Sequence, residues 1–215
     1  MHVEHLFFKH HKGDDYFFKD LSFTLEKGKM HALHGKNGVG KSVLFDILHK
    51  TVPCNSLFLG KIVSEKIECL SQQFDITLAN EFTFLENLQC SSFKKFPSPF
   101  RFLKQVDHFG SIEIEKILLR FHIDPTLLVH KLSGAQRQIL ALLMKLAKKP
   151  KILLLDEPTA ALDEENATMV FEFLNSLQNI TLFVICHDQK MIHRYATGTH
   201  FTLKKHHDGS RILIS

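Results

Sequence analysis

The stretch LHGKNGVGKSVLF, residues 33–45, constrains the possible folds more than any other part of this chain. Within it, residues 35–42 fit the pattern G-x-x-x-x-G-K-[ST], in which successive backbone N–H groups curl around a phosphate. The pattern assigns charge neutralisation to Lys41 and contact with Mg²⁺ to Ser42. Glycine is required because the backbone must approach the anion closely. We therefore predict a phosphate-binding loop here.

The segments on either side of this loop have the order that the pattern requires. KMHALHG, residues 29–35, is typical of a short strand, and KSVLFDILHK, residues 41–50, has apolar residues spaced along one face of a helix. A helix that begins at Lys41 directs the positive end of its dipole at the same phosphates. The prediction is thus a strand, a loop and a helix in succession.

Length and composition limit the architecture to one well-cored domain. The chain has 215 residues, of which 44% are hydrophobic, and this length is too short for two full nucleotide-binding domains. The formal net charge is +4, from 27 basic and 23 acidic residues, and the lysines lie in scattered pairs. A solvated surface accounts for this pattern better than a nucleic-acid groove. We therefore expect no nucleic-acid partner.

The cysteines and the apolar runs indicate a protein of a reducing compartment. The four cysteines form no CxxC pair and no secretory leader precedes them, so we expect free thiols in the cytosol. The longest apolar runs, ILLL and TLFVIC, are far shorter than the roughly 18 to 20 residues that span a bilayer, so a membrane role requires a partner. The 15 histidines lack cysteine or carboxylate partners at ligand spacing, and we predict no metal site among them.

A second signal comes from KKPKILLLDEPTAALD, residues 148–163. Its apolar run at residues 152–155 is typical of a strand buried on both faces of a parallel sheet, and the run ends in Asp156 and Glu157. Ligands of such sheets bind at the carboxyl ends of the strands. We expect Asp156 to hold Mg²⁺ with Ser42, and Glu157 to act as general base toward water. The alternative is two solvated acids at the end of a strand.

A third signal is KLSGAQRQILALLMKLAKK, residues 131–149, whose apolar residues recur at the steps of a helix. Ser133 and Gly134 precede the helical pattern. A serine in this place is typical of a helix N-cap. A serine and a glycine at a helix N-terminus are equally suited to binding a second anion. Both interpretations stay open at this point.

Five motifs in this order resemble those of the nucleotide-binding subunit of an ATP-binding cassette (ABC) transporter. GKNGVGKS resembles the family's Walker A motif, and ILLLDE resembles its Walker B motif. LSGAQ is similar to the family's signature LSGGQ, AALD to a loop that ends here at Asp163, and CHD to a switch motif whose histidine is His187. The motifs extend from residue 35 to residue 188, so the resemblance covers nearly the whole chain.

The resemblance implies an α/β fold: a P-loop NTPase core with a mainly parallel sheet, an N-terminal antiparallel β subdomain and an inserted α-helical subdomain. We expect a single ABC ATPase domain over residues 1–215, with the catalytic core at 1–75 and 132–215 and the helical subdomain at about 76–131. In this family a glutamine between the two lobes senses Mg²⁺ and the membrane partner. It corresponds to Gln72 or Gln73, and the register of the preceding strand KIECLS favours Gln72.

The resemblance also implies a function. ATP binds with Mg²⁺ between two cassettes docked head to tail, so that Ser133 and Gly134 of one chain complete the site of a second, identical or related chain. Hydrolysis, with Glu157 orienting water and His187 holding the terminal phosphate, opens the pair. That motion powers transport of an unidentified substrate through separate permease subunits. The chain is then expected on the cytoplasmic face of the membrane.

The site residues expected on this basis divide by role. The catalytic residues are Glu157, His187 and Gln72, and the Mg²⁺ ligands are Ser42, Gln72 and Asp156. The nucleotide-binding residues are Gly35, Lys36, Asn37, Gly38, Val39, Gly40, Lys41, Ser42, Val43, Ser133, Gly134, Gln136 and Asp163. Two rival functions remain: a soluble ABC ATPase for assembly or remodelling without a transporter, and a P-loop kinase acting on a small acceptor. The kinase has no use for LSGAQ, AALD and CHD together.

The chain departs from the family pattern in its signature motif and at its adenine-stacking position. Ala135 replaces the second glycine of the signature, and we expect weakened but retained nucleotide binding unless the site needs a positive φ there. The family stacks adenine on an aromatic side chain near the N-terminus. That position corresponds here to His10 or His11, with Tyr16 as another candidate.

Overall fold

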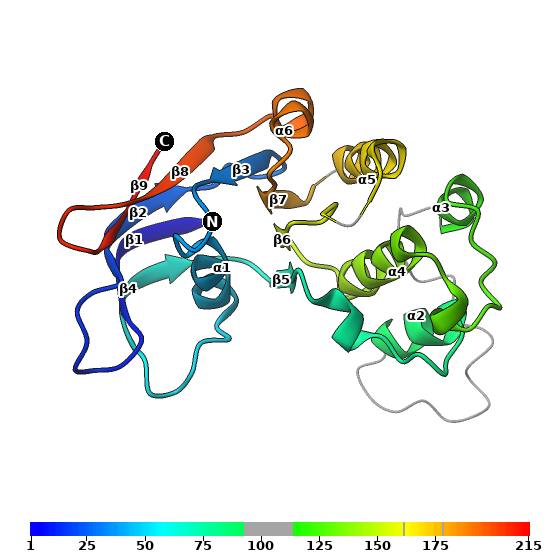
Figure 1. Ribbon diagram of the computed structural model, residues 1–215, viewed down its shortest axis with the longest axis horizontal. Coiled ribbons are helices and arrows are strands. Elements are labelled where there is room, and N and C mark those ends of the chain that lie inside the picture. Colours follow the sequence, from blue (N-terminus) through cyan, green and yellow to red (C-terminus); the bar gives the residue numbers. More distant parts are fainter. Residues whose placement is uncertain (93–113, 161, 178) are drawn as a thin grey trace. The chain divides into compact units, whose positions relative to one another are not determined.

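The computed structural model of the protein describes residues 1–92, 114–160, 162–177 and 179–215, and Figure 1 shows it coloured along the sequence. The chain divides into two compact units. One, which we call the sheet unit, comprises Met1–Gln72, Pro150–Ala160 and Ala167–Ser215. The other, which we call the helical unit, comprises Gln73–Lys149 and Ala161–Asn166.

The strands that the structure describes all belong to the sheet unit and form one sheet of nine strands. They are β1 (His2–Lys9), β2 (Phe18–Thr24), β3 (Met30–His34), β4 (Leu57–Val63), β5 (Ile67–Leu70), β6 (Ile152–Asp156), β7 (Thr181–Ile185), β8 (His200–Lys205) and β9 (Arg211–Ile214). Their order across the sheet is β4-β1-β2-β9-β8-β3-β7-β6-β5.

The strands on the β5 side of the sheet are parallel, and their sequences explain why. β6 reads ILLLD and β7 reads TLFVI, and every residue of both strands is buried. Val184 of β7 lies opposite Ala32 of β3 on one side and Leu155 of β6 on the other. β8 extends the parallel order beyond β3, and β5 extends it beyond β6. Continuous apolar strands of this kind occur where both faces of a sheet are covered.

The N-terminal strands are antiparallel. β1 pairs antiparallel with both β2 and β4, and β8 and β9 form an antiparallel hairpin. The predicted fold class, an α/β protein with a mainly parallel sheet and an antiparallel N-terminal part, is confirmed. The turn between β8 and β9 includes Asp208.

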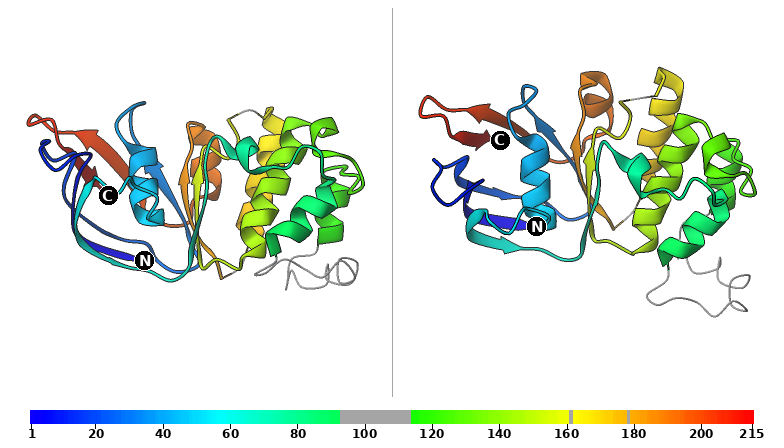
Figure 2. Two further views of the ribbon diagram at one scale, coloured as in Figure 1. Left: turned by 90° about the horizontal axis from the view of Figure 1, so that it is seen from below. Right: turned by 60° about the horizontal axis from the view of Figure 1, so that its bottom comes forward.

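Helix α1 (Lys41–His49) fills the core of the sheet unit. Its buried side chains include Leu44 and Leu48, which belong to one hydrophobic cluster with Phe8 of β1 and Phe183 of β7. Full burial of each such side chain contributes roughly 1.5–3 kcal/mol to folding. In Figure 2 the curved strands of the sheet pass around α1. Two further helices are α5 (Glu164–Ser176) and α6 (Gln189–Tyr195).

The helical unit contains the short 3₁₀ turns η1 (Phe74–Thr77) and η4 (Val129–Lys131) and the helices α2 (Phe84–Ser92), α3 (Ile114–Arg120) and α4 (Gly134–Ala147). Helices α2 and α4 pack against each other. The helical subdomain expected at about residues 76–131 includes residues 93–113, which lie outside the described residues, so its extent stays a prediction. None of the helices that the structure describes has the length and apolar character needed to cross a bilayer.

Candidate nucleotide site

The loop between β3 and α1 has a backbone that suits glycine at its two ends. Gly40 has φ +108°, and a Cβ atom there would lie 2.6 Å from the Phe17 ring. Gly35 has φ +149°, and a Cβ atom there would lie 2.7 Å from the carbonyl oxygen of Leu203. Both positions therefore exclude a side chain by conformation and by space. The predicted strand, loop and helix are confirmed as β3, residues 35–40 and α1.

The Lys41 ammonium group lies within the curve of this loop. Its Nζ atom donates hydrogen bonds to the carbonyl oxygens of Gly35, at 2.9 Å, and of Lys36, at 3.3 Å. The residue is only 8% exposed. A partly desolvated cation interacts more strongly with an anion than a cation in bulk water does. Lys41 is therefore positioned for the charge neutralisation that its motif predicts.

The first turn of α1 is suited to an anion. Gly40 is the N-cap residue, and no side chain among the described residues caps the helix there. The first turn also contains no acidic residue. The first N–H groups of a helix have no partners within the helix, and together with the helix dipole they favour a bound anion.

The remaining residues of the loop differ in whether they are exposed or pack against the core. Lys36, Asn37 and Gly38 are exposed, as is Ser42 in the first turn of α1. The side chains of Val39 and Val43 instead pack in or against the hydrophobic core. These two valines can therefore contribute to a nucleotide site through their backbone alone.

Asp156 ends β6 close to Ser42 and fits the predicted Mg²⁺ role. Burial raises the pKa of Asp156, a hydrogen bond from the Ser42 hydroxyl opposes this rise, and the nearby Glu157 carboxylate adds to it. A divalent cation would offset the cost of ionising a buried carboxylate. Carboxylate and hydroxyl oxygens are also the hard ligands that Mg²⁺ prefers.

Glu157 and His187 contact each other directly at the carboxyl ends of the parallel strands. The Nε2 atom of His187 lies 2.8 Å from Oε1 of Glu157, and the two side chains are 53% and 19% exposed, respectively. Glu157 follows β6, and His187 lies two residues beyond the end of β7. Because β6 and β7 are paired and parallel, their ends meet at the same edge of the sheet. The structure thus brings together the predicted general base and the predicted switch histidine.

Gln72 lies two residues beyond β5 and is exposed. Leu70, the last residue of β5, is in register with Leu155 of β6, so β5 ends at the edge of the sheet where Glu157 follows β6. Gln73, the other candidate, is the N-cap of the 3₁₀ turn η1 and belongs to the helical unit. Among the two glutamines, Gln72 is therefore the one at the strand-end edge of the sheet unit.

Ser133 and Gln136 form a capping box at the start of α4. The backbone N–H of Gln136 donates to the Ser133 hydroxyl at 3.2 Å, and the Gln136 Oε1 atom accepts from the Ser133 N–H at 3.0 Å. The Gln136 amide also donates to the carbonyl of His122, at 3.0 Å. The N-cap interpretation of Ser133 is therefore confirmed. The side-chain amide of Gln136 is occupied within the helical unit, so a nucleotide contact by that amide requires these bonds to be exchanged.

The other residues of the signature region are accessible. Gly134 is exposed, and a Cβ atom there would meet nothing within 4 Å in the part of the chain that the structure describes. Ala135 lies in α4 and does not have a positive φ. The alanine is therefore accommodated without backbone strain at this position.

Asp163 caps the start of α5. Its carboxylate accepts hydrogen bonds from the backbone N–H of Asn166, at 2.8 Å, and from the Asn166 side chain, at 2.9 Å. Both hydrogen bonds lower the pKa of Asp163, and the one from the Asn166 backbone has the larger effect. Ala161 of the AALD motif lies outside the described residues.

The aromatic ring that touches the phosphate loop was not predicted from the sequence. It belongs to Phe17, whose ring blocks the Cβ position of Gly40. The guanidinium carbon of Arg211 lies 3.7 Å from the centroid of the same ring. His10 contacts Phe17 edge to face, with ring centroids 4.6 Å apart. Of the three predicted adenine-stacking candidates, His10 is therefore the one beside this ring.

The other two candidates have different neighbours. His11 Nδ1 is 2.9 Å from the side-chain nitrogen of Asn55. The ring of Tyr16 packs against Phe7, with centroids 5.4 Å apart, and carries the Lys9 ammonium group over its face. Local sequence gave no signal for Phe17 and Arg211, because they meet through the parallel pairing of β2 with β9.

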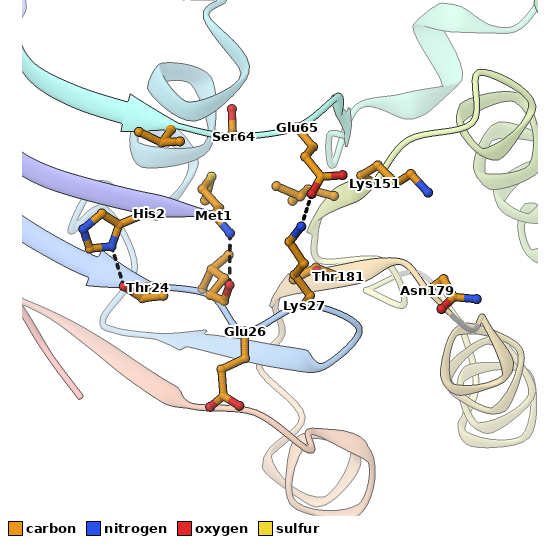
Figure 3. Close-up of a pocket in the computed structure, with 13 residues that line it drawn as sticks. Met1, His2, Thr24, Glu26, Lys27, Ser64, Glu65, Lys151, Asn179 and Thr181 are labelled. Atoms are coloured by element: carbon orange, nitrogen blue, oxygen red, sulfur yellow. Dashed lines mark hydrogen bonds and ion pairs between the residues drawn. The ribbon is translucent and has the colours of Figure 1, made fainter.

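A cavity of about 480 Å³ lies at the other ends of the same strands (Figure 3). Ile152 and Thr181, which begin β6 and β7, line it, whereas Asp156 is the last residue of β6. An ion pair between Lys27 and Glu65 lies across the cavity. Its described lining residues include none of the predicted site residues.

The cysteines and histidines were expected to hold neither disulfides nor a metal. Cys54, Cys69, Cys90 and Cys186 all lie within the described residues and form no disulfide bond there. Burial raises the pKa of the Cys186 thiol, which lies beside the site. Within the described residues, no group of three or more His, Cys, Asp or Glu side chains is arranged to hold a metal ion.

The strand, glycine loop and helix, with two adjacent carboxylates at the carboxyl end of β6, define a nucleoside-triphosphate-binding protein of the P-loop class. The ABC transporter family matches this chain over residues 18–160. That match covers more than half of the chain, and the chain therefore belongs to the ABC transporter family. It is an ATP-binding cassette that hydrolyses ATP, as the resemblance of its motifs implied.

Relatives with established names support this assignment. The molybdate import ATP-binding protein MolC of Haemophilus influenzae is 31% identical over 205 residues, covering 92% of this chain and 76% of the relative. The glutamine transport ATP-binding protein GlnQ of Geobacillus stearothermophilus is 27% identical over 194 residues, covering 82% of this chain and 76% of the relative.

A solved structure supports the fold. The chain superimposes on cbiO1 of Clostridium perfringens, part of the ABC transporter complex cbiONQ, with a TM-score of 0.74 and 22% sequence identity. The alignment covers 100% of this chain and 86% of that protein. At this level of identity the likeness establishes the fold alone.

Proposed function

We propose that this chain is the ATP-hydrolysing subunit that powers transport of a substrate through separate membrane subunits. The observation that carries the proposal is the presence of five cassette motifs in family order, in a chain whose relatives are named as ATP-binding proteins of molybdate import and glutamine transport. The substrate of this chain is a separate question, since the membrane subunits of such transporters select the cargo.

We assign the hydrolytic step to the phosphate loop and to the residues that follow β5, β6 and β7 in the sheet unit. Lys41 binds the terminal phosphates, and Glu157 accepts a proton from the attacking water. His187 holds Glu157 in position across the 2.8 Å contact and reaches the terminal phosphate from the same edge. Ser42, Asp156 and Gln72 hold Mg²⁺, which when bound neutralises charge on the phosphate oxygens. Removing the general base typically costs about 10²–10⁴ in rate.

The helix start at Ser133 and Gly134 acts on a second chain. Its exposed glycine and the first N–H groups of α4 suit a phosphate, as the start of α1 does in its own chain. ATP bound to the loop of one cassette is then covered by the signature helix of another, so that ATP joins the two chains. Hydrolysis removes this bridge and lets the pair open.

The helical unit connects the cassette to the membrane subunits. Ile76 in η1 is 79% exposed and Leu119 in α3 is 76% exposed, and both are large apolar side chains. Contiguous exposed apolar patches mark surfaces that bind a partner, and we propose that these two side chains form part of such a patch. Binding to membrane subunits locates the chain on the cytoplasmic face of the membrane.

Affinity purification of the tagged chain from gently solubilised native membranes tests this proposal. We expect a membrane protein with several spans to co-purify in stoichiometric amount. An Ile76→Asp variant is expected to lose this partner. Val63→Asp is the matched control, because Val63 is 51% exposed but lies on β4 of the sheet unit.

One outcome would contradict the transporter proposal, and a second would contradict only the proposed docking surface. If only soluble partners are recovered, a soluble ABC ATPase of assembly or remodelling replaces it. If the membrane partner is retained equally by both variants, the helical unit is not the surface that binds it.

A further inference from the structure

Arg211 brings a cation from the C-terminal hairpin to the phosphate loop. It is the first residue of β9, and its backbone N–H donates to the Phe17 carbonyl at 3.0 Å. Its guanidinium carbon lies 3.7 Å from the centroid of the Phe17 ring, the ring that closes off the Cβ position of Gly40. A planar cation and an aromatic ring are thus layered beside the loop that binds phosphate.

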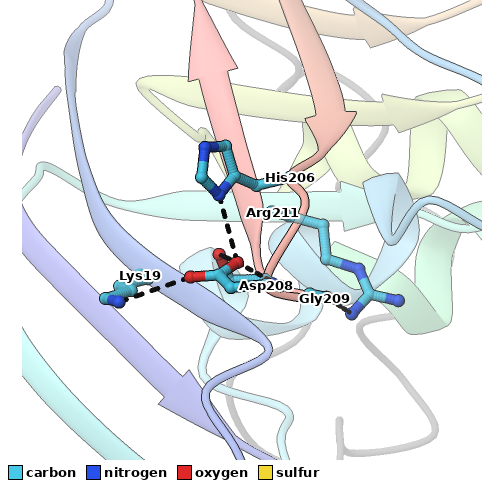
Figure 4. Close-up of polar contacts among 6 residues, drawn as sticks. Lys19, His206, Asp208, Gly209 and Arg211 are labelled. Carbon is cyan, nitrogen blue, oxygen red and sulfur yellow. Dashed lines mark hydrogen bonds and ion pairs between the residues drawn. The ribbon is translucent and has the colours of Figure 1, made fainter.

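The guanidinium group is held in place from two sides. Its Nε atom donates to the carbonyl oxygen of Val39 in the phosphate loop at 3.3 Å, and Nη1 donates to the carbonyl oxygen of Gly209 at 2.8 Å. Figure 4 shows Arg211 extending from the hairpin turn, with Nη1 bonded to Gly209. Arg211 is half-buried, and burial lowers its pKa without removing its charge at neutral pH.

The hairpin turn that carries Arg211 is itself fixed. Asp208 accepts hydrogen bonds from the Ser210 hydroxyl, at 2.6 Å, and the Ser210 N–H, at 2.9 Å. Lys19 of β2 also donates to Asp208, at 3.3 Å, and ties the turn to the neighbouring strand (Figure 4). Because these contacts order the side chain in advance, a ligand that binds Arg211 has little conformational entropy left to remove.

Part of the guanidinium group is not used by the protein. In the described portion of the chain, Nη2 of Arg211 makes no hydrogen bond. The Phe17 ring covers one of the two faces of the guanidinium plane. Guanidinium planes stack on nucleobases as well as on aromatic rings. The predicted stacking residue nearest to this position, His10, meets Phe17 with its ring at 78° to that ring and is not layered with it.

We propose that Arg211, backed by Phe17, is the residue that contacts the nucleobase of ATP in this chain. The guanidinium plane supplies the flat surface that an aromatic side chain supplies in other members of the family. Its hydrogen bond to the Val39 carbonyl holds that surface beside the phosphate loop. The proposal rests on ATP binding and not on the transporter role, so recovery of soluble partners alone would leave it unaffected.

Comparing ATP with inorganic tripolyphosphate tests the proposal, because the two ligands share the phosphates and only ATP has a base. Binding of each ligand with Mg²⁺ is measured by calorimetry on the full chain. For Arg211→Ala we expect roughly a tenfold loss of ATP affinity, the scale of base stacking and cation–π contacts, and tripolyphosphate affinity unchanged within about twofold. Arg211→Lys keeps the charge without the plane and is expected to lose ATP affinity similarly.

Lys204→Ala is the matched control, because it removes one positive charge from an exposed position on β8 of the same hairpin. It is expected to leave both affinities unchanged. Equal losses for ATP and tripolyphosphate in the Arg211 variants would overturn the proposal and assign Arg211 to the phosphates or to the loop. Unchanged ATP affinity in Arg211→Lys, with the fold verified by circular dichroism, would overturn it as well. Failure of the unaltered chain to bind either ligand would instead contradict the nucleotide site as a whole.

Discussion

Glu157 combines an uncommon backbone conformation with a direct contact to His187. Its φ of +53° lies in the left-handed region, which few residues other than glycine adopt. The Glu157 N–H donates to the Ile185 carbonyl at 2.9 Å, so the end of β7 holds the conformation. Strain of this kind costs of order 1–3 kcal/mol and persists only where surrounding structure imposes it. Its location supports a chemical role for Glu157 over a merely solvated acid at a strand end.

Ala135 is the residue at which the signature motif departs from its family, and reverting it tests what the methyl group costs. For Ala135→Gly we expect higher ATP turnover or tighter ATP binding, because a smaller residue lets backbone and nucleotide approach more closely. Glycine in a helix is less favourable than alanine by about 1 kcal/mol, so the free energy of unfolding is expected to fall. Steady-state ATPase assays and urea denaturation measure the two effects.

Ala147→Gly provides the matched control for this substitution, because it changes the same residue type at the other end of α4. It is expected to lower stability without raising turnover. A lower stability of Ala135→Gly with no gain in ATP turnover or ATP affinity would contradict the prediction.

Among the secondary-structure elements, the stability of the β8–β9 hairpin depends on the charge of Asp208. Hydrogen bonds from the Ser210 hydroxyl and N–H, together with His206 and Lys19, lower the pKa of Asp208 far below its ordinary range. A carboxylate whose pKa is lower in the folded state stabilises that state above its unfolded pKa, about 3.9, and loses the effect as the pH falls through the folded value.

Replacing this carboxylate with a neutral amide tests the dependence. Asp208→Asn is expected to lower the free energy of unfolding at pH 7, because charge-assisted hydrogen bonds are stronger than neutral ones. The difference in the free energy of unfolding between Asp208→Asn and the unaltered chain is expected to stay constant down to about pH 5. It is expected to shrink below about pH 4. Urea denaturation at a series of pH values measures it, with the exposed Asp15→Asn as control. A difference that does not change with pH would show that the carboxylate charge is not the cause.

The elements themselves could be predicted largely from local sequence, whereas several of their contacts could not. Residues 152–155 are uniformly apolar because β6 is covered on both faces, so the sequence alone indicated a buried strand. The apolar spacing of residues 41–50 likewise indicated α1. The contact of Arg211 with Phe17 depends on β9 inserting between β2 and β8, an arrangement that no local pattern encodes.

The signature helix shows a second limit of sequence reasoning. The spacing of Ser133 and Gln136 matches a capping box, but a pattern shared by capping and by anion binding does not separate the two roles. The structure adds that the Gln136 amide bonds to the His122 carbonyl, which belongs to the loop after α3. Only the folded helical unit reveals this partner, since residues 122 and 136 are not neighbours in one helix.

At the largest scale, we propose that each catalytic cycle needs two chains. The phosphate loop and the carboxylates belong to the sheet unit, whereas Ser133 and Gly134 belong to the helical unit. If the signature helix of one chain covers ATP on another, blocking hydrolysis must preserve the pair. Glutamine at position 157 cannot accept a proton from water, yet it retains the size of glutamate. Glu157→Gln is therefore expected to bind ATP and not to turn it over.

Multi-angle light scattering of Glu157→Gln at saturating ATP and Mg²⁺ tests whether ATP joins two chains. We predict a species of twice the 24.8 kDa chain mass with ATP, and a monomer with ADP. The double variant Lys41→Ala, Glu157→Gln is expected to stay monomeric with ATP, because Lys41 is needed to bind the phosphates. A monomer of Glu157→Gln that is fully loaded with ATP would contradict the account.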